Sequence, residues 1–275
     1  MLYLICTPIG NLNDFSIRSI NTLKEVDRIY AEDTRITAKL LKHFNISKNI
    51  IPFHEHNELN KIREITDRLI RKESIAIMSD AGAPLISDPG FPLIRRCIEL
   101  DLEFTSLPGP SSIINALMLS GIPVNQFSFY GFLPKQISAR EKIAKKLINS
   151  NQACVFFESA KRLSKTIEIF SNILEPITQI SICREMTKRH ESIYRGTIRD
   201  IKGLIENSEI TLLGEFVLVV YSQRTKKNNS LLDKNLYKHF LDYLSPSDAS
   251  RLIAKITDYP KQDIYKELIK ISKSS

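Results

Sequence analysis

Three loops of the sequence combine residue types that suit the binding of a small charged ligand. Residues 7–14, 79–90 and 108–112 each follow a short apolar run and are rich in glycine, proline and small polar side chains. Glycine adopts positive φ angles and lets a ligand approach the backbone, while proline fixes the shape of a loop. If the three loops meet, their backbone groups and the helix N-termini behind them can hold the carboxylate, amino group and adenosine of a nucleotide-like cofactor.

The loop over residues 79–90 is the most informative of the three. The apolar run 74–78 leads into it, two glycines and two aspartates lie within it, and a helical pattern begins at Pro92. A buried strand that ends in such a loop is where open α/β sheets bind their ligands. An ordinary connection between a strand and a helix is the alternative for any single loop, so the inference depends on all three.

Other motifs that carry chemistry are absent from the sequence or have a simpler interpretation. The sequence has no GxGxxG, GxxxxGK[ST] or HExxH pattern, which removes the strongest signals for a dinucleotide enzyme, a nucleoside triphosphatase and a zinc protease. His54 and His56 lie on one side of a predicted strand, but polar packing at the strand end is simpler, and we expect no metal site. Ser111 and Ser112 lack the form of a nucleophile elbow, and capping of the next helix explains them.

The order of the elements predicts where these loops lie. Short apolar runs alternate with amphipathic helical patterns over residues 1–122, which indicates a doubly wound, mainly parallel α/β sheet. In a parallel sheet the loops that follow the strands emerge at the same edge, so the three loops should line one crevice. The alternation continues over residues 123–222 and predicts a second α/β domain.

The last part of the chain, residues 223–275, differs in composition. A polar, basic linker precedes three short helical patterns at 231–244, 247–257 and 262–271, and the last two have a helix-turn-helix spacing. This part holds 11 Lys or Arg and 6 Asp or Glu, so +5 of the formal net charge of +8 lies here. The excess suggests an anionic partner such as nucleic acid.

Composition sets broader limits on the kind of protein. The 275 residues are 43% hydrophobic, an ordinary globular value, and are enough for two domains and an appendage. Four cysteines (Cys6, Cys97, Cys154 and Cys183) lie in apolar runs without a close pair, so we expect buried, reduced thiols of a cytosolic protein. The N-terminus enters a strand without a basic leader, and no apolar run reaches the roughly 18 residues of a spanning helix, so we expect no signal peptide and no membrane partner.

Eight motifs, in order along residues 2–221, resemble those of one family. They are Thr7-Pro8-Ile9-Gly10-Asn11-Leu12, Ala31-Glu32-Asp33-Thr34-Arg35, His54-Glu55-His56-Asn57, the run from Ser79 to Gly90, Pro108-Gly109-Pro110-Ser111, Gly131-Phe132-Leu133-Pro134, Arg184-Glu185-Met186-Thr187-Lys188 and Gly214-Glu215-Phe216-Val217. On these motifs the chain resembles the ribosomal RNA small-subunit methyltransferase I group of the tetrapyrrole methylase superfamily. Its basic helical tail resembles the C-terminal extension of that group.

The resemblance implies a fold, a cofactor and a reaction. It implies two α/β domains of the tetrapyrrole methylase type with the cofactor in the cleft between them, a small C-terminal helical extension and a homodimer. The implied cofactor is S-adenosylmethionine, and the implied reaction is 2′-O-methylation of a cytidine ribose in the decoding region of 16S ribosomal RNA. The implied substrate is small-subunit ribosomal RNA or the assembled 30S subunit.

The converging loops and the matching motifs together point to a set of cofactor-binding residues. The expected residues are Pro8, Gly10, Asp80, Ala81, Gly82, Ser111, Ser112, Phe157 and Glu158. The sequence departs from the usual motifs at three places: Ala83 stands for a Thr, Leu85 for a common Gly, and Ala160-Lys161 for a Pro-His pair. The Leu85 change removes a flexible position, and the missing imidazole argues against a histidine base.

For the implied methyl transfer, the protein must mainly align the reacting atoms, because the cofactor is already activated. A positioned base would help to remove the proton of the hydroxyl. The catalytic candidates are Glu185 and Lys188, with Arg35 opposite them beside Glu32 and Asp33. Lys188 could be a base if desolvation lowered its pKa, or could hold a phosphate while carboxylates accept the proton. A structural network of salt bridges across the cleft is the alternative.

Two other functions remain open at this point. A tetrapyrrole-type enzyme that methylates a small porphyrinoid would need no basic tail and should bind no RNA. A non-enzymatic nucleic-acid-binding protein would use the tail alone and would leave the three cofactor-like loops unexplained. An assay of methyl transfer to unmodified small ribosomal subunits separates these alternatives.

Overall fold

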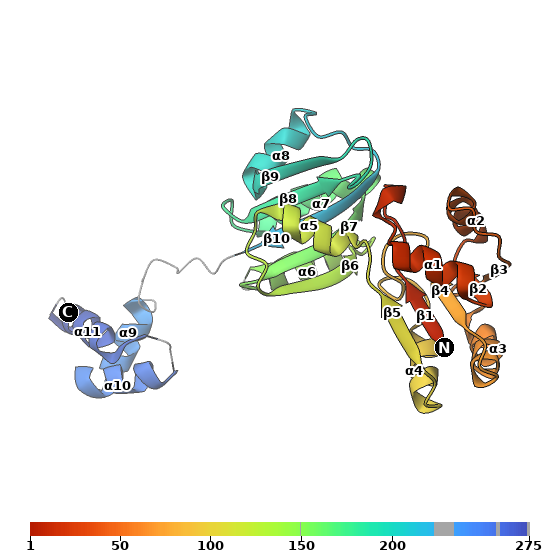
Figure 1. The fold of residues 1–275 in the computed structure, drawn as a ribbon. Helices are drawn as coiled ribbons and strands as arrows, with labels where there is room; N and C mark the ends of the chain where they lie inside the picture. Colours follow the sequence, from red (N-terminus) through yellow and green to blue (C-terminus); the bar gives the residue numbers. More distant parts are fainter. Residues whose placement is uncertain (149, 223–233, 257–258, 274–275) are drawn as a thin grey trace. The chain divides into compact units, whose positions relative to one another are not determined.

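A computed structural model describes the chain except for residues 149, 223–233, 257–258 and 274–275 (Figure 1). The chain divides into two compact units, Met1–Gln223 and Arg224–Ser275, and each is described by itself. The linker expected at the start of the basic tail lies outside the described residues. The boundary expected between residues 122 and 123 stays a prediction.

The first sheet is parallel throughout, as the alternating pattern predicted. Its strands are β1 (Leu2–Ile5), β2 (Arg28–Ala31), β3 (Ile50–Pro52), β4 (Ile75–Met78) and β5 (Phe104–Leu107), in the order β3-β2-β4-β1-β5. The helices that connect them are α1 (Ile17–Glu25), α2 (Thr34–His43), α3 (Glu58–Ile70) and α4 (Phe91–Glu99), with a 3-10 turn, η1, at Leu12–Asp14. Strand β1 therefore has β4 and β5 as its two neighbours.

Helices cover both faces of this sheet, which is why its central strand reads as a continuous apolar run. All four residues of β4 are buried. Ile75 and Ile77 face α3 and α4, while Ala76 and Met78 face α1 and α2. This alternation is the two-residue period of a strand, and burial on both faces is typical of parallel sheets.

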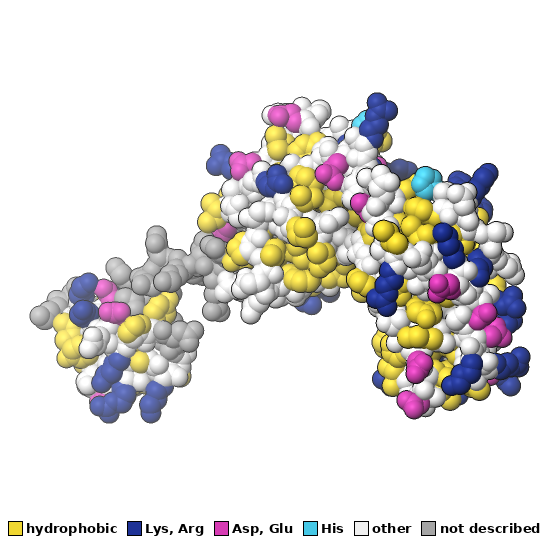
Figure 2. All heavy atoms as spheres, viewed as in Figure 1, with side chains coloured by type: hydrophobic (Ala, Val, Ile, Leu, Met, Phe, Trp, Pro, Cys, Tyr) yellow, Lys and Arg dark blue, Asp and Glu magenta, His cyan; other side chains and the backbone are white. Residues whose placement is uncertain are grey.

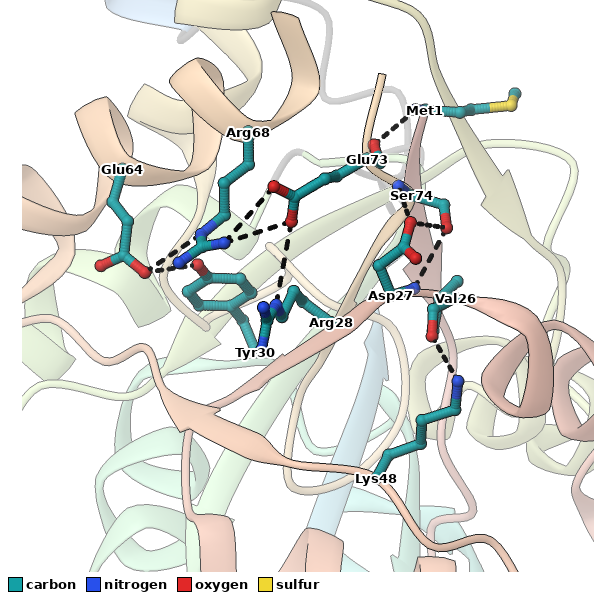
Figure 3. Close-up of polar contacts among 10 residues, drawn as sticks. All are labelled: Met1, Val26, Asp27, Arg28, Tyr30, Lys48, Glu64, Arg68, Glu73 and Ser74. Atoms are coloured by element: carbon teal, nitrogen blue, oxygen red, sulfur yellow. Dashed lines mark hydrogen bonds and ion pairs between the residues drawn. The ribbon is translucent and has the colours of Figure 1, made fainter. Parts of the chain in front are cut away.

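A polar network closes the amino ends of these strands (Figure 3). Arg68 of α3 contacts Glu64 at 3.4 Å and Glu73 at 3.1 Å, and the Tyr30 hydroxyl donates to Glu64 at 2.8 Å. Beside them, the backbone N–H and hydroxyl of Ser74 donate to Asp27. The loops that can bind a ligand lie at the opposite, carboxyl ends of these parallel strands.

The second sheet is mixed rather than parallel. Its strands are β6 (Phe127–Phe132), β7 (Ala153–Ser159), β8 (Gln179–Arg184), β9 (Ser192–Thr197) and β10 (Glu215–Tyr221), in the order β6-β7-β10-β8-β9. Only the β6–β7 pair is parallel. The sequence pattern did not predict β9, because this edge strand is only half-buried and shows no clear alternation of apolar residues.

Helices cover the two faces of the second sheet. The helices α6 (Ile137–Leu147), α7 (Ala160–Ile173) and α8 (Ile198–Glu206) pack on one face. Helix α5 (Ser112–Ser120), which follows the last strand of the first sheet, packs on the other face. There Ala116 and Leu117 contact a cluster that contains Val155 of β7 and Val217 of β10. One helix thus joins the first sheet's loop region to the core of the second.

The second unit is a small helical bundle. Its helices are α9 (Lys234–Leu241), α10 (Pro246–Ile256) and α11 (Lys261–Lys273), which confirms the three predicted helices, although positions 231–233 and 257 lie outside the described residues. Tyr237, Ile253 and Leu268, one from each helix, form its core. All four cysteines are buried and free, as expected. Among the described helices, none is long and apolar enough to cross a membrane.

Candidate functional site

The three glycine- and proline-rich loops meet at the carboxyl edge of the first sheet. They follow β1, β4 and β5, which are adjacent parallel strands. The backbones of Thr7 and Gly82 exchange two hydrogen bonds, at 2.8 and 3.1 Å. Gly109 lies so close to Cys6 that a Cβ added there would stand 2.7 Å from the Cys6 Cβ. The predicted convergence of the loops is confirmed, and it depends on backbone contacts.

A cavity of about 430 Å³ lies between these loops and the second sheet. The first sheet and its loops contribute Ile9, Glu32, Asp80, Ala81, Gly82, Ala83, Ile86, Ser87, Asp88, Ser111, Ser112 and Ile113 to its lining, and the second sheet contributes Phe132, Phe157, Glu158, Ser159, Met186, Gly214, Glu215, Phe216 and Val217. Small-molecule sites commonly have volumes of about 300–1,000 Å³ and mix apolar walls with a few polar groups. The size and lining therefore fit a cofactor.

Seven of the nine predicted cofactor-binding residues line this cavity, and two do not. The two exceptions are Pro8 and Gly10. A Cβ added at Gly10 would stand 2.5 Å from Lys188 Cγ and 2.7 Å from Thr187 Oγ1, and the neighbouring Asn11 N–H donates to Thr187 at 3.1 Å. Gly10 thus allows the first loop to pack against the loop after β8, which sets the spacing of the two cavity walls.

Helix capping explains part of the third loop. The Ser111 hydroxyl accepts the N–H of Ile114, so Ser111 is the N-cap of α5, as predicted. This contact satisfies one of the free N–H groups of the first turn. Ser111 and Ser112 both line the cavity, which places the N-terminus of α5 beside any ligand there. A helix N-terminus favours negatively charged groups such as a carboxylate.

Glu158 lines the cavity, but its carboxylate has protein partners. Arg162 forms an ion pair with it at 2.6 Å, and the Thr166 hydroxyl donates to it at 2.7 Å. The backbone N–H of Ser159 donates to it as well, at 2.8 Å, and the Glu158 side chain is fully buried. This carboxylate therefore holds Arg162, Thr166 and the Ser159 backbone together at the end of β7.

The predicted catalytic pair forms a local ion-pair network at the edge of the site. Lys188 Nζ lies 3.0 Å from Glu185 and 2.9 Å from Glu215, and the Glu215 N–H donates to Glu185 at 2.8 Å. Burial works against its charged form, but the two carboxylates raise the pKa of Lys188. Burial also works against ionised Glu185, but the Glu215 N–H and Lys188 lower its pKa. This pairing disfavours Lys188 as a neutral base.

Arg35, the third predicted catalytic residue, lies away from this pair. Its guanidinium pairs with Asp33 at 2.5 Å, and 86% of its side chain is exposed. Hydrogen bonds from Arg35 lower the pKa of Asp33. Within the described residues, Arg35 forms no ion pair with Glu185 and does not line the cavity.

The structure brings together three carboxylates that sequence reasoning did not treat as a unit. Glu32, Asp80 and Asp88 all line the cavity, and in the described part of the chain none of them forms an ion pair with Lys or Arg. Burial, together with the nearby charges of Glu32 and Asp80, raises the pKa of Asp88 to about 7. Burial and Asp80 also raise the pKa of Glu32. An unpaired carboxyl that titrates near neutrality is a candidate for acid–base chemistry.

The departures from the usual loop motif have a structural consequence at Leu85. This residue has φ +73°, in the left-handed region that costs a side-chain-bearing residue about 1–2 kcal/mol. Its side chain lies against Gly90 and the apolar cluster under the first sheet. A glycine at this position would avoid the strain and lose that packing. Ala83 lines the cavity.

The histidine pair shows no arrangement for a metal. The rings of His54 and His56 lie 5.9 Å apart. Outside residues 149, 223–233, 257–258 and 274–275, no group of three or more His, Cys, Asp or Glu side chains is placed to hold a metal ion. The Asn57 side chain accepts the backbone N–H of His54, so this segment begins α3 with a polar turn.

Comparison with known proteins gives consistent findings. A model of the family Tetrapyrrole (Corrin/Porphyrin) Methylases matches residues 1–202. A protein of Xylella fastidiosa named ribosomal RNA small subunit methyltransferase I is 37% identical over 265 residues, which cover 96% of this chain and 97% of that protein. A protein of the same name from Hydrogenobaculum sp. is 41% identical over 232 residues, which cover 84% of this chain and 99% of that protein.

Solved structures share the fold at low sequence identity. The methyltransferase CobJ has a TM-score of 0.58 and 17% identity, over 80% of this chain and 93% of that one. The uroporphyrin-III-C-methyltransferase from Thermus thermophilus has a TM-score of 0.55 and 16% identity, over 80% of this chain and 93% of that one. At such identities the likeness concerns the fold alone, and it supports the two-sheet architecture described above.

Proposed function

We infer the activity of this chain from its family: it belongs to the tetrapyrrole methylases and, within them, to the ribosomal RNA small subunit methyltransferase I family. It is accordingly a methyltransferase of small-subunit ribosomal RNA. In finer detail, we propose transfer of a methyl group from S-adenosylmethionine to the ribose 2′-oxygen of a cytidine in the decoding region of 16S ribosomal RNA. The observation that carries the proposal is the match to relatives of this name over nearly the whole chain.

The cavity supports S-adenosylmethionine as the cofactor. The loops that contain Gly82 and Ser111 offer backbone groups and the N-terminus of α5 to a carboxylate. Glu32, Asp80 and Asp88, which form no ion pair with Lys or Arg within the described residues, offer carboxylates to a sulfonium and an ammonium group. The cofactor supplies an already activated methyl group when it is bound. The residues of the cavity thus match both charge signs of this ligand.

A base for the ribose hydroxyl completes the proposed mechanism. Asp88 is our first candidate, because it lines the cavity and burial raises its pKa to about 7, a value at which a general base is effective near neutral pH. Its carboxylate would accept the hydroxyl proton as the oxygen bonds to the methyl carbon and the carbon–sulfur bond breaks. Glu185 stays a second candidate. For Lys188 we propose that its ammonium group binds an RNA phosphate at the rim of the cavity.

The basic tail fits an RNA partner. Helices α10 and α11 expose Lys255, Lys261 and Lys266, and 88% of Tyr243 is exposed in the turn after α9. Exposed cations bind the phosphate backbone, and an exposed ring offers a stacking surface. The Hydrogenobaculum protein of the same name aligns over 99% of its own length with only 84% of this chain. Proteins of this name can therefore lack a segment that this chain has. We propose that the tail strengthens RNA binding and takes no part in the chemistry.

The resemblance to this family also implies a homodimer, and an apolar surface supports it. Figure 2 shows hydrophobic side chains gathered around the middle of the first unit. Helix α5 exposes Ile114 and 73% of Met118, on the side opposite the residues it buries against the second sheet. Large exposed apolar residues in a cluster mark interaction surfaces. We propose that a second copy covers them, and light scattering with Met118→Glu tests this.

One assay tests the proposed function as a whole. The full chain is incubated with methyl-labelled S-adenosylmethionine and small ribosomal subunits from cells that lack this modification. We expect label in the small-subunit RNA, resistant to alkaline cleavage at one position because a 2′-O-methyl group blocks it. Label in a porphyrinoid that is supplied in a parallel sample, and none in RNA, would favour a tetrapyrrole substrate. RNA binding without any transfer would favour a non-enzymatic role.

A further inference from the structure

Phe132 is an exposed aromatic residue at the mouth of the cavity. It lies at the end of β6 and lines the cavity, yet 63% of it is exposed. One side of the ring is supported by Phe157, whose ring centre lies 5.3 Å away at an interplanar angle of 65°. Among the exposed aromatic side chains in the described part of the chain, Phe132 is distinguished by lining the cavity, so its ring is open to a ligand bound there.

The end of β6 is bent toward the first domain. The pairing of β6 with β7 shifts register between Phe129 and Phe132, and Gly131 has φ +69° between them. A Cβ added at Gly131 would lie 3.8 Å from the Ser87 hydroxyl, so the strand end faces the loop that carries Asp88. Irregularities of this kind redirect a side chain at the end of a strand. Phe132 is thereby placed across from the carboxylates of the opposite wall.

Two arginines fix the residues that follow Phe132. Arg162 donates to the carbonyl of Leu133 at 3.0 Å, and Arg140 donates to the carbonyl of Lys135 at 3.0 Å. The backbone N–H of Leu133 also donates to the Phe157 carbonyl, at 3.2 Å. The segment is therefore held at three backbone positions, so the exposed ring sits on a rigid support.

A buried polar network connects the two arginines to each other. Glu158 pairs with Arg162 at 2.6 Å and accepts from Thr166 at 2.7 Å, and Arg140 donates to the same Thr166 hydroxyl at 3.0 Å. Glu158 and Arg140 are both buried. Burying charged side chains away from water is costly unless well-placed ion pairs and hydrogen bonds offset the loss of hydration. Here the network holds Arg162 and Arg140 in the positions from which they bind the backbone that follows Phe132.

We propose that Phe132 is the platform on which the base of the target nucleotide stacks while its ribose occupies the cavity. The inference rests on the proposed RNA methylation and deepens it. A ribose hydroxyl can reach into the cavity only when its nucleotide leaves the stack of its neighbours, and the base then needs a new stacking partner. Aromatic side chains supply this contact in RNA recognition. A phenyl ring has no hydrogen-bonding group, so it supports the base without reading its identity.

The test compares substitutions at two exposed phenylalanines of the same strand. Phe132→Ala removes the platform, Phe132→Trp keeps an aromatic ring, and Phe127→Ala is the control, because 43% of Phe127 is exposed and it does not line the cavity. For unmethylated small subunits we expect KM to rise roughly 5- to 150-fold with Phe132→Ala, the range for loss of one stacked base. Phe132→Trp keeps a stacking surface and should raise KM less than Phe132→Ala does, Phe127→Ala should stay near wild type, and the affinity for S-adenosylmethionine should not change.

Two results would overturn the proposal. Weaker S-adenosylmethionine binding with an unchanged KM for subunits would assign the ring to the cofactor. Unchanged values for both ligands in Phe132→Ala would leave the ring without a role in binding. A thermal melt of each variant shows whether it is folded, and Phe132→Trp provides a second folded comparison. The wild-type protein is assayed in a separate sample. If it does not methylate RNA, the proposed function is rejected, whatever the role of Phe132.

Discussion

Thr7 and Gly82 are joined backbone to backbone by two hydrogen bonds, of 2.8 and 3.1 Å, although 75 positions separate them in the chain. The pair is an isolated antiparallel bridge between the loop after β1 and the loop after β4. Gly82 makes these contacts with φ +82°, in the region that favours glycine. The floor of the cavity therefore depends on one residue without a side chain.

Gly82→Val should weaken cofactor binding and lower stability. A branched residue at this φ costs about 1–3 kcal/mol, and its Cβ would stand 3.4 Å from Ile9 Cγ2. We expect at least a tenfold loss of affinity for S-adenosylmethionine, measured by calorimetry, with a lower Tm. Gly203→Ala is the control, because nothing lies within 4 Å of a Cβ added in helix α8, where alanine is the better residue. Unchanged affinity in Gly82→Val would remove this loop from the cofactor site.

Asp88→Asn should slow methyl transfer without abolishing cofactor binding. Loss of a general base costs roughly 10²- to 10⁴-fold in rate. In the wild type, kcat/KM should fall as the pH drops below about 7, because protonated Asp88 cannot accept the hydroxyl proton. The variant should lose this dependence, which initial rates between pH 5.5 and 9 measure. If Glu185→Gln removes the pH dependence and Asp88→Asn keeps it, Glu185 is the base.

Asp88→Asn should also change how stability depends on pH. The pKa of Asp88 is about 7 in the folded protein against an ordinary value of 3.8, so between these values the folded state holds a proton that the unfolded state has released. Wild-type stability therefore falls as the pH rises through this window, and asparagine removes the effect. The Tm of the variant minus that of the wild type should grow from pH 4 to 7 and then level off.

Asp200→Asn is a suitable control for this measurement. Asp200 belongs to the capping box of α8, and hydrogen bonds from Thr197 lower its pKa. Its contribution is fully present above its ordinary pKa and is lost only at lower pH. The difference in Tm between Asp200→Asn and the wild type should thus be constant from pH 5 to 8. A flat difference for Asp88→Asn as well would contradict the raised pKa.

Thr166→Val should destabilise the first unit. The fully buried Thr166 hydroxyl donates to Glu158 and accepts from Arg140, and valine has the same shape without either hydrogen bond. Leaving buried polar groups without partners costs about 1–3 kcal/mol. Urea unfolding of the full chain measures the free energy of unfolding. Ser171→Ala on the same helix removes an exposed hydrogen bond and should change it by less than about 0.5 kcal/mol.

Charge reversal in the tail should weaken RNA binding in a salt-dependent way. Lys255→Glu with Lys266→Glu changes two exposed cations of α10 and α11. Each lost phosphate contact should lower the slope of log K against log salt by about 0.7–0.9. Filter binding of small subunits at several salt concentrations measures this slope. The control is Lys24→Glu, which changes an exposed cation of α1. An unchanged slope would assign the tail another role.

The shared edge of the loops could be predicted from sequence because it follows from strand direction, whereas their contact depends on the strand order and on the backbone hydrogen bonds between Thr7 and Gly82. Loops after β1, β4 and β5 share an edge whatever their side chains are, once the sheet is parallel. The N-cap role of Ser111 was predictable for a different reason, since a cap is a local contact, although Ser112, for which capping was also expected, is the first residue of the helix. Strand β9 was not predictable, because its residues are half-exposed and its place depends on pairing with β8.

The roles of the carboxylates could not be read from the sequence. Lys188 is held as an ammonium partly by Glu215, which reaches it because β10 pairs with β8 and places Phe216 opposite Arg184. The raised pKa of Asp88 results from burial beside Glu32, a residue more than fifty positions away. Both effects depend on the tertiary positions of distant charges, whereas the sequence shows only their types. The sequence motifs identified the residues of the site, whereas the tertiary structure determines which of its carboxylates form ion pairs.

The strand order of the second sheet has a consequence for synthesis of the chain. Strand β10, Glu215–Tyr221, lies at the centre of the sheet between β7 and β8, yet it is the last strand to leave the ribosome. Until it emerges, the sheet exists as two separate halves, and the apolar face of α5 lacks Val217 and Val219. A nascent chain that ends before residue 215 therefore exposes hydrophobic surface that is prone to aggregation. The binding cavity, whose lining includes Phe216 and Val217, is completed only near the end of translation.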